Sequence, residues 1–323
     1  MRFALMTEPQ QGLSYEQQLA IVRRAESVGF ETFFRSDHYQ SFPGPAGEPT
    51  TDAWAVLAGL ARDTSRIGLG VLVSPVTFRR IGNLAKVITT VDEMSGGRVE
   101  FGIGAGWNEP EHRQLGLPFP EIGERAAMLE EQFAVLHGLW GEPDGWSFNG
   151  KHVTIEEASF HPKPIARPGR PVGPNGAARP RLLAGSEGSP RGLRIAARYA
   201  DEFNLSSSSP EIAVEKYAAL RAACEAIGRD PATIARSVMA GVLMGRDETE
   251  LARRKSALLA AFGDETGGDA WFAAREPRWI LGTADGARAM VQRFADAGAE
   301  RIMLQDFIPR DLEMIDLMAE ALF

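Results

Sequence analysis

The chain has 323 residues, of which 44% are hydrophobic and 24% are charged, and its formal net charge is -8. These proportions are ordinary for a soluble globular protein, and the acidic balance argues against nucleic acid or an anionic membrane surface as a partner, because both require a basic face. The single cysteine, Cys224, cannot form an internal disulfide, so we expect a reducing compartment, the cytoplasm. The first residues contain no long apolar run, so neither a signal peptide nor a membrane span is expected.

The amino-terminal part of the chain alternates short apolar runs with amphipathic segments. Residues 2–6 predict a strand. Ser14, with Gln17 three positions later, has the capping pattern of a helix start, and Gly29 is placed to end that helix. The next strands and helices are expected, in order, at 31–36, 52–63, 66–73, 81–94 and 98–103.

The alternation is interrupted twice. After a helix over 121–139, residues 140–181 predict a small hairpin followed by a proline-rich stretch, and residues 263–280 form a second polar, glycine-rich excursion. We predict that both excursions cover a substrate pocket and exclude water from it. The remaining strands and helices are expected at 182–185, 190–199, 202–205, 210–227, 237–244, 248–262, 283–297, 301–304 and 311–322.

The elements add up to eight strand–helix units in regular order, with the excursions after strands four and seven. This pattern predicts an α/β fold, a TIM (β/α)8 barrel, formed as a single domain by residues 1–323. A doubly wound open sheet is the alternative, but eight units in about 300 residues favour the closed barrel.

Polar side chains follow the second predicted strand directly. Phe33 and Phe34 are strand formers, and Ser36, Asp37 and His38 stand where the strand should end. In such a barrel the chemistry is at the carboxyl ends of the strands, and a histidine there can act as acid, base or hydrogen-bond donor. The alternative is a histidine bonded to a loop carbonyl. The five histidines form no metal-binding pattern, which disfavours a metal-dependent hydrolase, and we expect no metal site.

Two glycine-rich loops are candidates for ligand contact. The loop around Gly102, Gly104 and Gly106 imitates a dinucleotide fingerprint, but no third glycine opens a helix at the right spacing. We interpret this loop instead as backbone that approaches a flat ligand closely, which glycine permits. The alternative interpretation is a flexible loop without a ligand. Gly185 to Pro190 opens a helix, where free N–H groups bind phosphate well; an ordinary Ser-Pro cap is the alternative.

Taken together, several motifs resemble the luciferase-like monooxygenase superfamily, most of all its branch that uses the deazaflavin coenzyme F420. The resemblance covers nearly the whole chain and is specific for the superfamily, but less specific for the cofactor. The motifs are Ser36–His38, Gly70–Arg79, Ser95–Arg98, Gly102–Glu109, Glu111–Arg113 and Ala196–Asp201.

The resemblance implies a bacterial luciferase-like barrel that binds the cofactor ring at the carboxyl ends of its strands. It implies that Asp37 and His38 line the ring, with His38 placed for catalytic proton transfer, and that a non-proline cis peptide near Val71 and Leu72 forms a bulge behind the ring. The other implied cofactor contacts are Ser36, Gly104, Ala105, Gly106, Asn108, Gly185, Ser186 and Glu187, the last three at the cofactor phosphate.

One position departs from the resemblance. Some F420-using relatives carry a glutamate directly after the Gly-x-Gly of the fourth strand's loop, whereas this chain has Trp107 there and Glu109 two places on. The acid role of this loop and the substrate of those relatives are therefore not carried over. Basic residues for the polyglutamate tail of F420 are also not obvious.

The sequence therefore predicts an enzyme, an oxidoreductase that exchanges hydride between F420 and a small organic substrate, with His38 handling the proton. One alternative is a two-component monooxygenase that uses reduced FMN and oxygen with a separate reductase as partner. Another is a non-catalytic flavin-binding protein. The resemblance also implies a homodimer.

Overall fold

The computed structural model describes residues 1–263 and 268–323. Eight parallel strands close into a barrel, because β8 pairs with β9 and β1 lies between β2 and β11. In barrel order the strands are β1 (Arg2–Thr7), β2 (Thr32–Arg35), β3 (Gly68–Pro75), β4 (Val99–Gly104), β7 (Arg181–Ser186), β8 (Glu202–Ser206), β9 (Ala235–Met244) and β11 (Arg301–Asp306). The predicted TIM barrel is confirmed, and the open doubly wound sheet is excluded.

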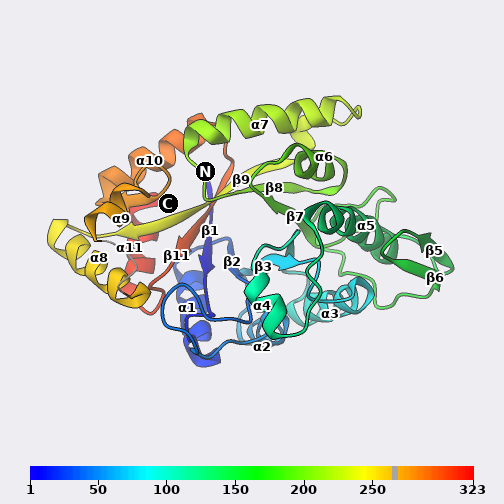
Figure 1. Ribbon diagram of the computed structural model, residues 1–323, viewed down its shortest axis with the longest axis horizontal. Coiled ribbons are helices and arrows are strands. Elements are labelled where there is room, and N and C mark those ends of the chain that lie inside the picture. The colour runs from blue at the N-terminus through cyan, green and yellow to red at the C-terminus, as the bar shows by residue number, and fades with distance from the viewer. Residues whose placement is uncertain (264–267) are drawn as a thin grey trace.

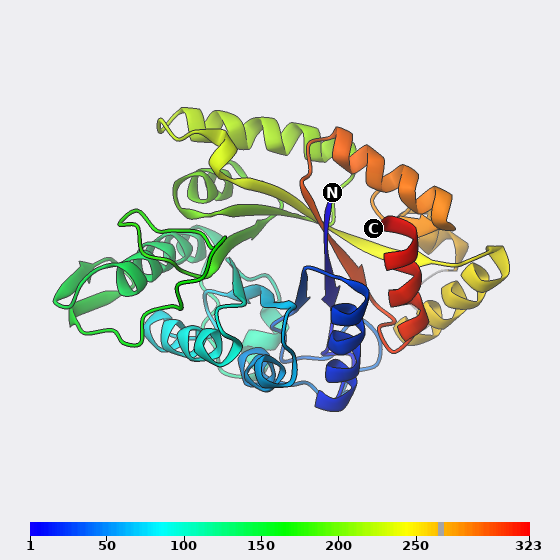
Figure 2. The same ribbon diagram turned by 180° about the vertical axis from the view of Figure 1, so that it is seen from behind.

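Helices surround the barrel and connect its strands (Figures 1 and 2). They are α1 (Tyr15–Val28), α2 (Ala53–Asp63), α3 (Ile81–Ser95), α5 (Ile122–Gly141), α6 (Pro190–Tyr199), α7 (Pro210–Glu225), α8 (Glu248–Phe262), α10 (Ala284–Asp296) and α11 (Leu312–Leu322). Two short helices, α4 (Glu109–Gln114) and α9 (Asp269–Ala273), lie in the connections. The strand β10 (Ile280–Gly282) extends the sheet beside β9. None of these helices is long and apolar enough to cross a bilayer.

The predicted helix start at Ser14 is confirmed in detail. The Ser14 hydroxyl accepts a hydrogen bond from the Gln17 N–H, the Gln17 side chain accepts one from the Ser14 N–H, and Gly29 ends α1 with φ +99°. The main differences are α4 and β10, which the sequence did not predict, and β3, which starts two residues later than expected and runs through Pro75.

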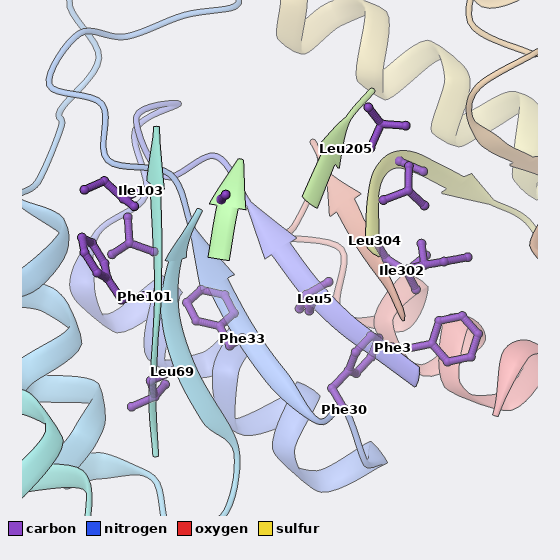
Figure 3. Close-up of a cluster of buried hydrophobic side chains, with 14 of the residues drawn as sticks. Phe3, Leu5, Phe30, Phe33, Leu69, Phe101, Ile103, Leu205, Ile302 and Leu304 are labelled. Carbon is purple, nitrogen blue, oxygen red and sulfur yellow. The ribbon is translucent and has the colours of Figure 1, made fainter. Parts of the chain in front are cut away.

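The core has an outer and an inner layer because side chains alternate along each strand. Outward-facing residues such as Leu5, Phe33 and Phe101 pack between the strands and the helices (Figure 3). The inner layer fills the barrel with Ala4, Met6, Phe34, Leu72, Leu183 and Met303. We call the carboxyl end of the barrel the mouth. Polar side chains lie there, directly above this inner layer.

The third strand contains the cis peptide implied by the family resemblance. It joins Leu72 to Val73, one residue later than expected, and the pairing of β3 with β4 shifts register between Val71 and Ser74. As a consequence, the Val73 side chain points toward β4 and β7.

The first excursion lies at the opposite end of the barrel from the mouth. Its hairpin, β5 (Trp146–Asn149) and β6 (Thr154–Ala158), contacts α5, where a Cβ on Gly138 would lie 2.0 Å from Trp146. The proline-rich stretch is fixed by Arg170, whose guanidinium binds Asp92 at the end of α3 through contacts of 2.8 and 2.9 Å. The prediction that residues 140–181 cover the substrate pocket is therefore wrong. An insertion between a helix and the next strand must return to the strand's amino-terminal end.

The second excursion reaches the mouth. Its strand β10 pairs with the carboxyl-terminal half of β9, and the indole of Trp279 covers Gly241, where a Cβ would lie 2.1 Å away. The prediction for 263–280 falls partly on residues 264–267, which lie outside the described residues. That it covers a substrate pocket stays a prediction.

Candidate active site

His38 forms a buried pair with Glu111. His38 follows β2, and its Nδ1 lies 2.9 Å from Glu111 Oε2. The histidine side chain is 14% exposed and the glutamate 1%. The edges of Phe42 and Trp107 flank the imidazole, with ring centroids at 4.5 and 5.7 Å. His38 is therefore a fixed side chain with limited access to solvent.

Glu111 is held by three further donors. Its Oε1 accepts from the N–H groups of Tyr39 and Gln40, and the Asn108 amide donates to Oε2 at 3.3 Å. Because a carboxylate only accepts, it places the proton of His38 on Nδ1. Within the described part of the chain, no residue bonds to His38 Nε2, so this nitrogen is available to a ligand.

The short helix α4 carries this glutamate and ties three loops together. His112 follows Glu111 in the chain, and its Nε2 is hydrogen-bonded to Thr77 Oγ1 at 2.6 Å. Its Nδ1 donates to the Asn108 carbonyl at 2.6 Å. Sequence reasoning missed α4 and the roles of Glu111 and His112. Pro110 in the first turn of α4 is the signal that pointed to a helix start.

Asp37 faces a different set of partners from His38. Its buried carboxylate accepts from Ser74 Oγ at 2.6 Å and from both Arg79 Nη atoms at 2.5 and 3.0 Å. Arg79 also binds Asp52 at 2.5 Å. Burial opposes ionisation of Asp52, but hydrogen bonds from Tyr39 and Ala55 and the Arg79 charge lower its pKa to about 2. Asp37 thus fixes Arg79 and β3, and its contact with a cofactor ring stays a prediction.

The strand ends of β3, β4 and β7 present very little side chain. A Cβ on Gly104 would lie 2.9 Å from Val73 Cγ2, and a Cβ on Gly185 would lie 2.5 Å from Val73 Cγ1. Val71 is fully buried in the outer layer and Leu72 in the inner one. Of the three, only Val73 is partly exposed at this position. The Val73 side chain therefore packs directly on these two glycines, neither of which has room for a Cβ, and we call Val73 with Gly104 and Gly185 the glycine cradle.

The other predicted cofactor residues surround this cradle. Ala105 and Gly106 are half-buried, and Asn108 is buried on Glu111. Ser186 Oγ accepts from the Gly188 N–H at 3.1 Å, and Glu187 is exposed. Ser36 is buried and donates to Gln10 Oε1 at 2.6 Å. The structure thus brings all of them to the mouth, and their cofactor contacts stay predictions.

Within residues 1–263 and 268–323, no three His, Cys, Asp or Glu side chains gather in a way that could hold a metal ion.

Comparison with known proteins decides the family. A model of the luciferase-like monooxygenase family matches residues 1–309. The chain belongs to this family. Its relatives include monooxygenases and F420-dependent dehydrogenases, so the chain is an oxidoreductase.

Two curated relatives illustrate the range of the family. The pyrimidine monooxygenase RutA of Stutzerimonas stutzeri is 30% identical over 298 residues, which cover 89% of this chain and 75% of the relative. The F420-dependent glucose-6-phosphate dehydrogenase of Microbacterium testaceum is 32% identical over 196 residues, 59% of this chain and 53% of the relative.

Solved structures share the fold. An F420-dependent secondary alcohol dehydrogenase in complex with an F420–acetone adduct has a TM-score of 0.82 and 19% identity, covering 99% of this chain and 98% of its own. The oxygenating constituent of 3,6-diketocamphane monooxygenase from Pseudomonas putida, in complex with FMN, has a TM-score of 0.72 and 16% identity, covering 99% and 97%. The first of these two structures holds a deazaflavin adduct and the second holds a flavin.

Proposed function

We propose that this luciferase-like oxidoreductase binds coenzyme F420 at the mouth of its barrel and exchanges hydride with a small organic substrate. The observation that carries the proposal is the His38–Glu111 pair, in which a buried carboxylate fixes the imidazole and leaves Nε2 open. Such a pair can move one proton in step with a hydride, which a passive binding protein does not require.

The glycine cradle is the part of the mouth that fits the cofactor ring. Val73, Gly104 and Gly185 would lie against the ring, and the loop at Gly106 and Asn108 would border it. The backbone of Gly185, Ser186 and Glu187, ahead of α6, would hold the phosphate. When bound, the deazaflavin supplies the site that accepts or donates hydride.

The chain itself supplies positioning and proton transfer. Glu111 holds Nδ1–H of His38, so that Nε2 can take a proton from a substrate hydroxyl or return one. Phe42 and Trp107 flank the imidazole and restrict water. The buried Asp37–Arg79 ion pair links the loops after β2 and β3 and keeps His38 in place.

A second candidate is a monooxygenase that uses reduced FMN and oxygen with a separate reductase. It is favoured by the similarity to RutA, which extends over 89% of this chain, whereas the F420-dependent dehydrogenase matches 59%. The two cofactors differ in chemistry: a reduced flavin reacts rapidly with oxygen and a reduced deazaflavin does so poorly.

Titration of the purified protein with F420 and with FMN, followed by oxygen-consumption assays with each reduced cofactor, separates the candidates. We expect saturable F420 binding and no oxygen consumption above background. Tight FMN binding without F420 binding would contradict the proposal and favour the monooxygenase.

The same preparation tests two dependent proposals. A His38→Ala variant that retained both cofactor binding and full turnover would support a non-catalytic role for His38. Sedimentation analysis at several concentrations tests the homodimer, for which we expect twice the 35.1 kDa chain mass.

A further inference from the structure

The half of the mouth opposite the glycine cradle is polar. It is formed by β2, β1 and β11, which are neighbours in the barrel. Met6 and Met303 belong to the inner layer, so the alternation of side chains directs Glu8 and Gln305, two residues further along, into the mouth as well. Sequence reasoning did not single out either residue.

A continuous hydrogen-bonded chain crosses the three strand ends. Ser36 Oγ donates to Gln10 Oε1 at 2.6 Å, and Gln10 Nε2 donates to Glu8 Oε2 at 2.8 Å. From the other side, Gln305 Nε2 donates to Glu8 Oε1 at 2.5 Å. All four residues are buried, Glu8 to 7% exposure. Glu8 is therefore fixed in one orientation by neutral donors.

In the part of the chain that the structure describes, the Glu8 carboxylate has no cationic partner. Among the described residues, no Lys, Arg or His lies within 4.0 Å of its carboxylate, whereas buried charges are ordinarily paired. Two arginines of this end are engaged elsewhere: Arg79 binds Asp37 and Asp52, and the fully buried Arg35 donates to Gln18 and Thr51. A carboxylate has about four acceptor positions, and two of those on Glu8 are in use. The remaining two have no donor among the described residues.

An aromatic cluster lies on the strand that neighbours Gln305, the residue that donates to Glu8. Gln305 pairs in register with Gly241, and Gly241 is covered by the Trp279 indole. Trp279 in turn stacks on Phe307, with ring centroids 5.5 Å apart and an interplanar angle of 6°. A buried carboxylate without a charged partner favours a group that donates hydrogen bonds or carries positive charge.

We propose that Glu8 is a substrate-binding residue, and that the substrate group facing it is a hydrogen-bond donor or a cation and not a carboxylate or phosphate. This inference rests on the proposed function, because it places the substrate opposite the cofactor cradle. His38 follows Ser36 by two residues, so it stands at the boundary between the two halves, within reach of both cofactor and substrate.

Three probes with the same carbon skeleton test the proposal: 1-amino-2-propanol, 1,2-propanediol and lactate. Saturation-transfer NMR would give their dissociation constants for the protein as purified and with F420 added. We expect the amine to bind at least about tenfold more tightly than lactate, with the diol between them, since a charge-assisted hydrogen bond to a buried carboxylate has about that effect.

Glu8→Gln keeps the shape and removes the charge, and we expect it to abolish the difference between amine and lactate. Glu156→Gln, exposed on the remote hairpin, is the matched control and should leave the ranking unchanged. If Glu8→Gln does not fold, the order of amine, diol and lactate affinities for the wild-type protein still tests the proposal. Equal or tighter binding of lactate, or no binding of any probe, would overturn the proposal. The order of the three dissociation constants is measured without turnover. It can therefore support the role of Glu8 even if neither F420 nor FMN binds and the proposed function fails.

Discussion

Glu111 makes four contacts that together fix the orientation of one imidazole. Two of its partners are backbone N–H groups in the loop after β2, so the carboxylate positions the loop and the histidine at once. His38 and Glu111 are 73 residues apart in sequence. Sequence motifs marked both segments but did not show that they meet, because this contact depends on the path of two loops.

Replacement of Glu111 by Gln should lower turnover by about 10- to 100-fold, the usual cost of losing a partner that orients a functional group. The amide can no longer fix the Nδ1–H tautomer by accepting at both oxygens. Steady-state kinetics and cofactor titration of the same preparation check this, with Glu109→Gln, exposed on the same helix, as the control. Unchanged turnover in Glu111→Gln would remove the pair from the mechanism.

Asp306 is a buried carboxyl outside the mouth whose state depends on pH. Burial, with a contribution from Asp311, raises its pKa from 3.8 to about 7, and its Oδ2 has no hydrogen-bond partner among the described residues. Because the folded-state pKa is raised, the folded protein favours the protonated form. The free energy of unfolding should therefore fall as pH rises from about 4 to about 7.

Asp306→Asn should remove this dependence while keeping the acceptor for the Ile308 N–H. We expect the variant to be more stable than the wild type at pH 8 by roughly 1–4 kcal/mol, with a smaller difference at pH 5. Urea denaturation at both pH values measures it. An equal difference at the two pH values would show that Asp306 does not titrate in this range.

At the scale of elements, the close approach of β3, β4 and β7 depends on two glycines. A Cβ on Gly185 would meet Val73 Cγ1 at 2.5 Å, so Gly185→Ala should destabilise the protein by about 1–3 kcal/mol and weaken cofactor binding. Val73→Ala should recover a large part of this loss, because it removes the atoms that clash. A double-mutant cycle by chemical denaturation checks the coupling, and strictly additive effects would contradict the contact.

The proline-rich segment 161–180 is fastened to the barrel by a buried ion pair. Asp92 is fully buried and Arg170 is 7% exposed at the side chain. Arg170→Met should cost about 3–5 kcal/mol of stability because it leaves Asp92 without its charge partner. Denaturation midpoints measure the cost, with the exposed Arg167→Met as control. Cofactor affinity should not change, since the pair lies at the other end of the barrel.

At the scale of the whole molecule, the barrel could be predicted because its signals are local. Helix caps such as Ser14 and Gly29 and the apolar runs between them mark each unit. Eight such units favour a closed barrel, and the pairing of β8 with β9 closes it. The end of the barrel at which the first excursion lies follows from its place between a helix and a strand, but the way it is attached could not be predicted. Its attachment depends on Arg170 and Asp92, which are 78 residues apart.

The mouth was predictable only in part for the same reason. The ends of β2, β4 and β7 were marked by Ser36, Gly104 and Gly185, which stand directly after apolar runs. Val73 became visible only with the register shift of β3, and Glu8 only with its bond to Gln305, 297 residues away.

A crystal structure of the protein with F420 bound tests the central claim most directly. The account predicts the deazaflavin ring against Val73, between the ends of β4 and β7, with His38 Nε2 facing the substrate side of the ring and Nδ1 still on Glu111. A ring bound elsewhere, or a His38 turned away from it, would contradict the account.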